Sequence, residues 1–303
     1  MTSELPARPD LEQVRRQAKE LLRAAKGGDE AAMAQISAVS DEVILASAQL
    51  AVARAHGFES WPRLMTEIER REILTTRDTK RLGELLAGDP ALAARSLEQW
   101  CDHPKGARPL GFIAMLRFDA QRLGLTGDLP GTGEIARALL AAGAPVDGEP
   151  GDPETPLITA ASYGDADVAR ELVAAGADLE AVAAPNAGGV PGGTAVLHAA
   201  VFGMTAVLDV LVAAGAQIRG IEEAAAAGDV RGWLTAETPL EPRIRALVMA
   251  ADHERLSVID DLLAAGTPID ATDAAWGRQA MGVARENDRE ASIAHLLARG
   301  SKA

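Results

Sequence analysis

The sequence predicts an all-α solenoid, a stack of short helical pairs, and three observations support that fold class. Five segments end in closely related strings, ALLAAGAPVD, ELVAAGADLE, VLVAAGAQIR, DLLAAGTPID and HLLARGS. The glycines that these strings share are Gly143, Gly176, Gly215, Gly266 and Gly300, at intervals of 33, 39, 51 and 34 residues. Aromatic residues make up only 3% of the chain, while alanine and leucine abound. Small residues suit closely packed helices, and a repeat of 20 to 50 residues is typical of stacked arrays.

Each repeating unit also has a predicted first helix. The strings TPLITAASYG, TAVLHAAVFG, RALVMAADHE and QAMGVARENDR begin 21 residues before four of those glycines, at Thr155, Thr194, Arg245 and Gln279. Proline or alanine in the first turn favours the helix start, and a glycine after the second helix takes the left-handed cap. One unit therefore holds an inner and an outer helix, and its apolar face is covered only by its neighbours.

The inner-helix strings and the outer-helix strings resemble the ankyrin pattern, in which TPLHxAAxxG opens the inner helix and xLLxxGAD closes the outer one. Near the amino terminus, GFESWPRL is similar to a GFxSWxxL string found in bacterial ankyrin-repeat proteins. The whole chain resembles an actinobacterial type of ankyrin-repeat domain-containing protein. The resemblance implies an ankyrin-repeat solenoid that works as a binding scaffold; it implies no particular activity.

The predicted organisation has two parts. Residues 1–70, which include the helix strings LEQVRRQAKELLRAAKGGD and VILASAQLAVARAHG, form an amino-terminal helical cap segment. Residues 71–303 form the array of about six to seven units. Degenerate units are expected near 71–106 and 218–242, the latter with a short helix, a glycine and a second short helix. Loops are inserted at 117–131 and 184–193, and Trp61, Trp100, Trp233 and Trp276 are interpreted as packing residues at irregular joints.

Charge and composition exclude several classes of function. The formal net charge of −14 repels phosphate backbones and anionic lipid, which argues against nucleic-acid or membrane partners. No apolar run reaches about 18 residues and no leader is evident, so we expect a cytoplasmic protein. Cys101 is the single cysteine, and the five histidines lack metal-ligand spacing. We therefore expect no metal and no cofactor.

The string LPGTG at 129–133 matches a cell-wall sorting pattern by coincidence. A sorting signal requires a following hydrophobic span and a basic tail at the carboxyl end, whereas a repeat helix and about 170 more residues follow here. The string also lacks the strand and the lysine of a phosphate loop. It is predicted to belong to the inserted loop.

The predicted binding surface is the concave groove formed by inner helices and the fingers between units. Aromatic side chains on consecutive inner helices favour an anchor site, although packing within the helix layer explains Phe112 and Phe202 equally well. The acidic second half of the groove favours a basic partner. The predicted groove residues are Phe112, Met115, Thr159, Ser162, Tyr163, His198, Val201, Phe202, Asp252 and His253.

Two functions remain open from sequence. The first is a binding or scaffold protein whose groove holds a protein partner. The alternative is a cofactor-independent enzyme of isomerase, lyase or cyclase type, acting on a small organic molecule by acid and base chemistry. Tyr163 and His198 would be its catalytic pair, because neighbouring inner helices lie about 8 to 10 Å apart. No nucleophile motif accompanies them, so whether the chain is an enzyme at all stays open, with binding favoured.

Overall fold

The computed structural model describes residues 5–97 and 108–302. The chain forms two compact units, Met1–Ala144 and Pro145–Ala303. In the described residues every regular element is a helix, apart from one isolated antiparallel bridge between Val182 and Thr194. The all-α prediction is confirmed. Among these residues no helix is both long and apolar enough to span a bilayer.

Unit 1 begins with four helices whose starts follow local capping rules. They are α1 (Leu11–Lys26), α2 (Glu30–Ser37), α3 (Leu45–Ala55) and α4 (Trp61–Thr76). Asp10 accepts a hydrogen bond from the Gln13 amide at 2.7 Å, and Ser60 accepts one from the Arg63 amide at 3.3 Å. Such side chains satisfy amide groups that the first helical turn leaves unpaired. The residue 70 boundary that the sequence predicts falls inside α4.

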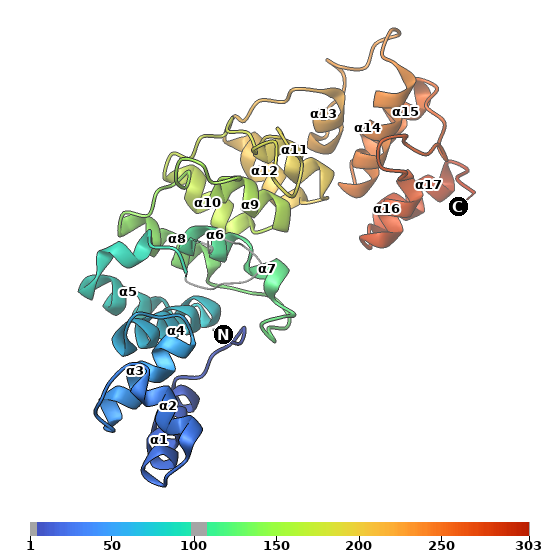
Figure 1. The fold of residues 1–303 in the computed structure, drawn as a ribbon. Helices are drawn as coiled ribbons and strands as arrows, with labels where there is room; N and C mark the ends of the chain where they lie inside the picture. The colour runs from blue at the N-terminus through green and yellow to red at the C-terminus, as the bar shows by residue number, and fades with distance from the viewer. Residues whose placement is uncertain (1–4, 98–107, 303) are drawn as a thin grey trace. The chain divides into compact units, whose positions relative to one another are not determined.

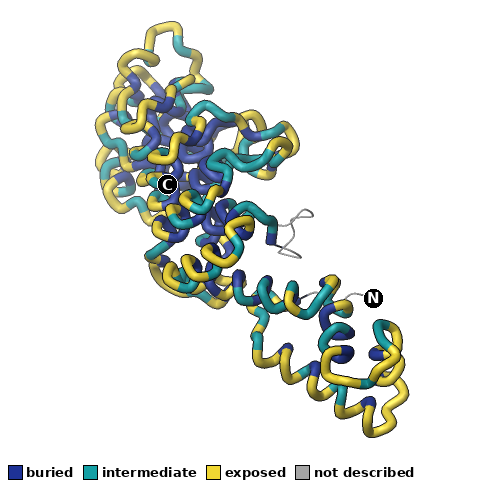
Figure 2. Tube along the Cα trace, turned by 90° about the vertical axis from the view of Figure 1, so that its left-hand side faces the viewer, coloured by how far each residue is buried: buried dark blue, intermediate teal, exposed yellow. Residues whose placement is uncertain are grey.

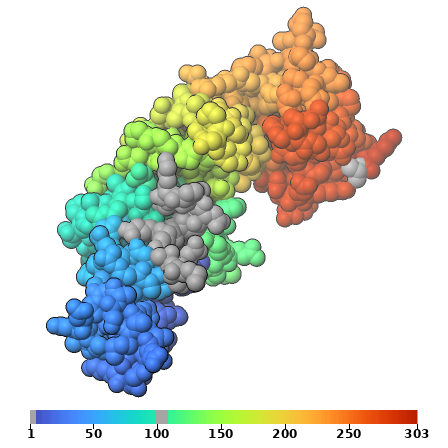
Figure 3. All heavy atoms as spheres, viewed as in Figure 1, coloured from blue at the N-terminus to red at the C-terminus, as the bar shows by residue number. Residues whose placement is uncertain are grey.

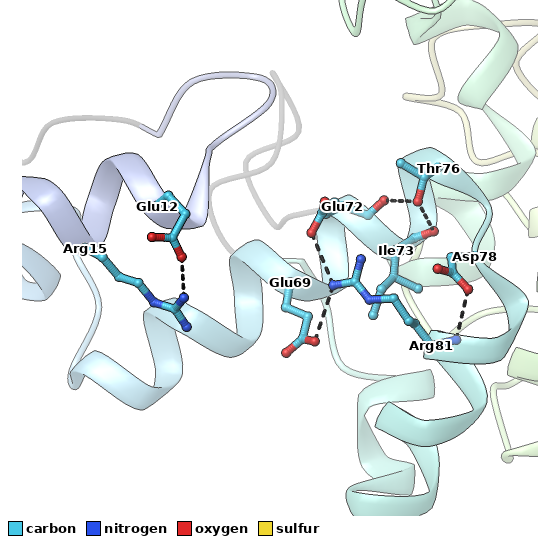
Figure 4. Close-up of polar contacts among 8 residues, drawn as sticks. All are labelled: Glu12, Arg15, Glu69, Glu72, Ile73, Thr76, Asp78 and Arg81. Atoms are coloured by element: carbon cyan, nitrogen blue, oxygen red, sulfur yellow. Dashed lines mark hydrogen bonds and ion pairs between the residues drawn. The ribbon is translucent and has the colours of Figure 1, made fainter.

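The turn between α4 and α5 (Thr79–Gly88) is held by charged side chains (Figure 4). Arg81 pairs with Glu69 at 3.4 Å and Glu72 at 3.2 Å on the preceding helix, while Asp78 caps α5 by accepting from the Arg81 amide at 3.0 Å. Ion pairs at such partly exposed positions add little stability.

A buried arginine joins α4 to the 3-10 turn η1 (Pro90–Ala93) and the chain after it. Arg70 is nearly inaccessible and donates to the carbonyls of Leu92, Arg95 and Ser96 at 3.2, 2.8 and 2.8 Å. Its charge is balanced by Glu67 at 2.6 Å. The predicted degenerate unit near 71–106 thus contains α5 and η1; its residues 98–106 lie outside the described residues.

The insertion at 117–131 packs against other residues of unit 1. It separates α6 (Pro109–Ala114) from α8 (Thr132–Ala141) and contains part of the short α7 (Leu116–Asp119). Leu123 and Leu129 are buried, the Leu123 carbonyl accepts from Arg8 at 3.3 Å, and the Pro130 carbonyl accepts from Arg77 at 2.8 Å. Residues 129–131 of the LPGTG string therefore form a packed loop, as predicted, while Thr132 and Gly133 already belong to α8.

Unit 2 consists of two rows of helices (Figure 1). The inner row is α9 (Pro156–Tyr163), α11 (Ala195–Val201), α13 (Ile221–Ala227), α14 (Leu240–Asp252) and α16 (Ala280–Glu286). The outer row is α10 (Ala166–Ala174), α12 (Thr205–Ala213), α15 (Leu256–Ala264) and α17 (Glu290–Ala298). Buried residues gather where helices meet (Figure 2). Helices α16 and α17, coloured red, are the last helices of the inner and the outer row (Figures 1 and 3).

The outer row is interrupted after α13. The sequence predicts a second short helix before residue 242, and this prediction is wrong, because residues 229–239 form turns. Arg255 instead joins the flanking helices: it donates to the Ala226 carbonyl at 2.8 Å and to Asp209 at 2.5 Å. One guanidinium thus connects α12, the end of α13 and the start of α15 where an outer helix is missing.

Candidate functional site

Unit 2 contains a cleft of about 360 Å³ on the side of the inner helices and fingers. The floor comes from α11, α13 and α14, and the finger that precedes α16 contributes a tryptophan. The side chains that define this cleft are Leu197, Glu222, Glu223, Arg245, Met249 and Trp276. The cleft has an apolar wall, and the carboxylates of Glu222 and Glu223 lie at the start of α13.

Glu223 is the buried carboxylate of the cleft, only 5% exposed. It accepts a hydrogen bond from the main-chain amide of Arg219, which precedes α13. Burial raises the pKa of Glu223 above its ordinary value; the amide and the charge of Arg219 oppose the rise, and the charges of Glu222 and Glu180 add to it. A buried carboxylate is costly to ionise without a partner of opposite charge.

The two arginines that line the cleft are already paired. Arg245 donates to Glu222 through Nε at 2.9 Å and Nη2 at 2.8 Å, and Arg219 pairs with Glu180 at 2.8 Å. Among the described residues, no basic side chain lies within 4.0 Å of the Glu223 carboxylate. The cleft therefore holds one carboxylate whose charge no side chain balances directly.

Trp276 is held in a short closed loop and is 47% exposed. The buried carboxylate of Asp273 accepts from the amides of Trp276 at 2.7 Å and Arg278 at 2.9 Å. The Arg278 guanidinium lies over the indole, 4.8 Å from the ring centroid, and donates to the Val201 carbonyl at 3.1 Å. The interpretation of Trp276 as a packing residue is thus corrected, because its indole forms part of the cleft wall. Trp100 lies outside the described residues.

His198 is fully buried and holds the finger before α11. The Val190 amide donates to its Nε2 at 3.0 Å, so the proton is on Nδ1, which donates to the Thr194 carbonyl at 2.9 Å. Both ring nitrogens are therefore bonded to main chain. A general acid or base must reach its substrate, so this geometry gives the Tyr163 and His198 pair no support.

Asp252 and His253 belong to a buried polar network around the carboxyl end of α11, each being 2% exposed. Asp252 accepts from Asn287 at 2.8 Å and from Arg289 at 3.3 Å. His253 donates to the Ala200 carbonyl at 3.0 Å, while Arg289 donates to the Gly203 carbonyl at 2.6 Å. These donors satisfy carbonyls that the end of a helix leaves unpaired, so the two residues stabilise the stack and offer no surface to a partner.

The remaining predicted groove residues divide by burial. Phe112 and Met115, in unit 1, are buried, and so are Ser162 and Val201 in unit 2. The Ser162 and Thr159 hydroxyls bond to carbonyls of their own helix at 2.9 and 3.2 Å. The expectation of surface contact is thereby corrected for the buried members.

Tyr163 and Phe202 occupy equivalent positions in two neighbouring repeat units. Each lies at the carboxyl end of an inner helix, and the two helices, α9 and α11, are packed neighbours. Phe202 is 38% exposed, and its ring centroid lies 6.1 Å from that of the buried His198. Tyr163 is half-buried.

Sequence reasoning missed the cleft residues Glu223 and Trp276. A signal was present in the degenerate repeat, where two adjacent glutamates open α13. Their significance depends on burial, which the repeat pattern does not report.

A family model described as ankyrin repeats (3 copies) matches residues 129–220. Residues 129–220 carry ankyrin repeats. Together with the helical rows of unit 2, this confirms the predicted all-α ankyrin solenoid. A comparison with curated proteins finds no match.

Charge is distributed unevenly along the chain. Residues 145–303 hold 24 Asp and Glu against 11 Lys and Arg, a formal charge of −13 out of the −14 of the whole chain. Unit 2, which contains the cleft, therefore carries nearly all of the negative field. Among the described residues, no group of three or more His, Cys, Asp or Glu side chains is arranged to hold a metal ion.

Proposed function

We propose that the chain is a cytoplasmic protein-binding module, and that the inner-helix and finger side of unit 2 holds a basic protein partner. Ankyrin repeats generally mediate contacts between proteins, and their stacked units present extended surfaces for that purpose. The observation that carries the proposal is the cleft lined by α11, α13 and α14 in unit 2. Tyr163 and Phe202 lie outside this cleft, at the carboxyl ends of the inner helices α9 and α11.

The chemistry of this side supports a protein ligand. Phe202 and Trp276 are partly exposed aromatics, the residue type enriched among interface anchors. The charge of −13 on residues 145–303 attracts a basic partner and speeds its encounter at low ionic strength. Phosphate backbones would be repelled by the same field.

The test is affinity capture from lysate of the source cells with wild type and with the double variant Tyr163→Ala, Phe202→Ala. The expected result is a partner whose recovery falls at least about tenfold in the double variant, because two anchor contacts are lost. Thermal unfolding of the double variant should stay close to wild type, since both side chains lie at helix ends and keep some exposure.

The matched control is the double variant Val212→Ala, Leu297→Ala. Both side chains are exposed on outer helices, so they lie on the other row of the stack. Recovery of the partner should equal wild type. Equal recovery by the Tyr163 and Phe202 variant would contradict the proposal for this surface, and so would loss of capture in the control.

A further inference from the structure

The carboxylate of Glu223 is the unusual feature of the cleft. It is 5% exposed, has no basic side chain within ion-pair distance among the described residues, and lines a cleft that is open to solvent. An ionised carboxylate in such a place costs free energy that an incoming cation recovers. Arg219 stabilises the ionised carboxylate through its main-chain amide and, at longer range, through its charge. Neither arginine forms an ion pair with Glu223, because Arg245 pairs with Glu222 and Arg219 with Glu180.

The rest of the wall suits the stem of a long basic side chain. Leu197, Met249 and Trp276 give the cleft its apolar surface. Lysine and arginine bury their methylene stems along such surfaces while the charged end reaches a polar group. The cleft volume of about 360 Å³ admits one such side chain with its flanking backbone.

The tryptophan already binds a cation within the chain. Arg278 stacks on the indole with 4.8 Å between its guanidinium carbon and the ring centroid, and Asp273 fixes the loop through two amide hydrogen bonds. The indole is therefore pre-positioned at the edge of the cleft, and its ring electrons favour positive charge nearby.

We propose that this cleft receives a lysine or arginine side chain of the protein partner, with the stem against Leu197, Met249 and Trp276 and the charged end at the Glu223 carboxylate. The inference rests on the proposed binding function, and it assigns the preference for a basic partner to this one cleft. The groups that face Glu223 are Glu222 on α13, Arg245 on α14, and Arg219 and Glu180 on the chain before α13.

The experiment uses the full chain and three peptides, acetyl-GGKGG-amide, its arginine version and its norleucine version. Binding is followed by NMR through the indole N–H resonance of Trp276, assigned by Trp276→Phe. We expect saturable shifts with the two basic peptides and an affinity at least about tenfold lower for norleucine, which has a similar stem but no charge.

The decisive variant is Glu223→Gln, which keeps an oxygen that can accept from the Arg219 amide. The affinity of this variant for the lysine peptide should fall to the affinity of wild type for the norleucine peptide. Glu286→Gln makes the same charge change at an exposed site on α16 and should leave the affinity as in wild type. Should Glu223→Gln fail to fold, Trp276→Ala in its exposed loop gives the second test, with an expected loss of affinity of about fivefold. Binding to this variant, which lacks the indole, is followed through the main-chain amide resonance of Glu222.

Acidity provides a separate readout. The affinity of wild type for the lysine peptide should fall as pH is lowered from 7.5 to 5, because protonation of Glu223 removes the charge that the peptide binds. Glu223→Gln should lack this dependence.

Two outcomes would overturn the inference: equal affinity for norleucine and lysine peptides, or a lysine affinity that Glu223→Gln leaves unchanged. The proposed binding function fails differently. Partner capture that survives Glu223→Gln but is lost with Tyr163→Ala, Phe202→Ala would reject the basic-side-chain site while the binding function stands. Peptide binding with capture insensitive to the aromatic pair would reject the aromatic surface instead.

Discussion

The imidazole of His253 donates a hydrogen bond to the main-chain carbonyl of Ala200 at 3.0 Å, across 53 residues of sequence. Its other ring nitrogen bonds to the Thr205 hydroxyl at 2.9 Å. This ring therefore joins the end of α14 to the end of α11, past the degenerate unit between them. Because the ring is buried, it is held in its neutral form.

The first prediction follows from that neutral form. Burial lowers the pKa of His253 below 6.5, and the positive charges of Arg255 and Arg289 lower it further. Below pH 6.5 the unfolded chain binds a proton that the folded chain does not, so the free energy of unfolding falls with acidity. Urea titrations at pH 7.5 and 5.5 should show this decline, and it should be smaller in His253→Gln.

The second prediction concerns Asp252. In Asp252→Ala, Arg289 and Asn287 lose their acceptor inside the stack. Leaving these partly buried donors without that acceptor costs about 1 to 3 kcal/mol, which urea unfolding would measure. Asp167→Ala is the control, because its pair with Arg170 is exposed and should contribute little. Equal losses in the two variants would show that the Asp252 network does not stabilise the stack.

The third prediction concerns the finger before α11. His198→Leu removes the acceptor of the Val190 amide and the donor to the Thr194 carbonyl. We expect a loss of about 1 to 3 kcal/mol and faster amide hydrogen exchange in residues 183–193. The finger at 267–279 serves as an internal control, since its bonds do not involve His198. Unchanged exchange at 183–193 would mean that the finger is held without the histidine.

The fourth prediction compares two glycines with positive φ. Gly203 (φ 70°) lies against Asp252, and a Cβ there would be 2.7 Å from its carboxylate oxygens; Gly215 (φ 89°) has open space around it. Gly215→Ala should cost only the left-handed backbone penalty of about 1 to 2 kcal/mol. Gly203→Ala should cost more, because the carboxylate must also move. Thermal unfolding of both variants tests the difference, and equal costs would contradict it.

Much of the repeat architecture was predictable because its signals are local. Thr155 and Thr194 cap α9 and α11 through their own hydroxyls, at 3.2 and 3.3 Å from the amides three residues on. Gly176 and Gly215 take left-handed conformations directly after outer helices. These requirements act within a few residues, so the spacing of residue types reports them.

The candidate site was predicted less well. Tyr163 and Phe202 were recognised from their position in the unit, and they keep some exposure. Asp252 and His253 occupy the same position in a later unit but are buried, because Arg278, Arg289 and Asn287 from the following finger and helix hairpin close over that end of α11. The irregular unit near α13 alters what surrounds an otherwise equivalent position.

The sequence by itself determined the repeating pair of helices, its caps and the negative charge of the chain, since each depends on residue type and short spacing. Only the tertiary structure decided which polar groups are buried and which are paired. Glu223 has no ion-pair partner among the described residues because Arg219 and Arg245 pair with other carboxylates, and Trp276 reaches the cleft from a finger more than 50 residues later. Burial and pairing are set by neighbours distant in sequence, and those neighbours exist only once the units stack.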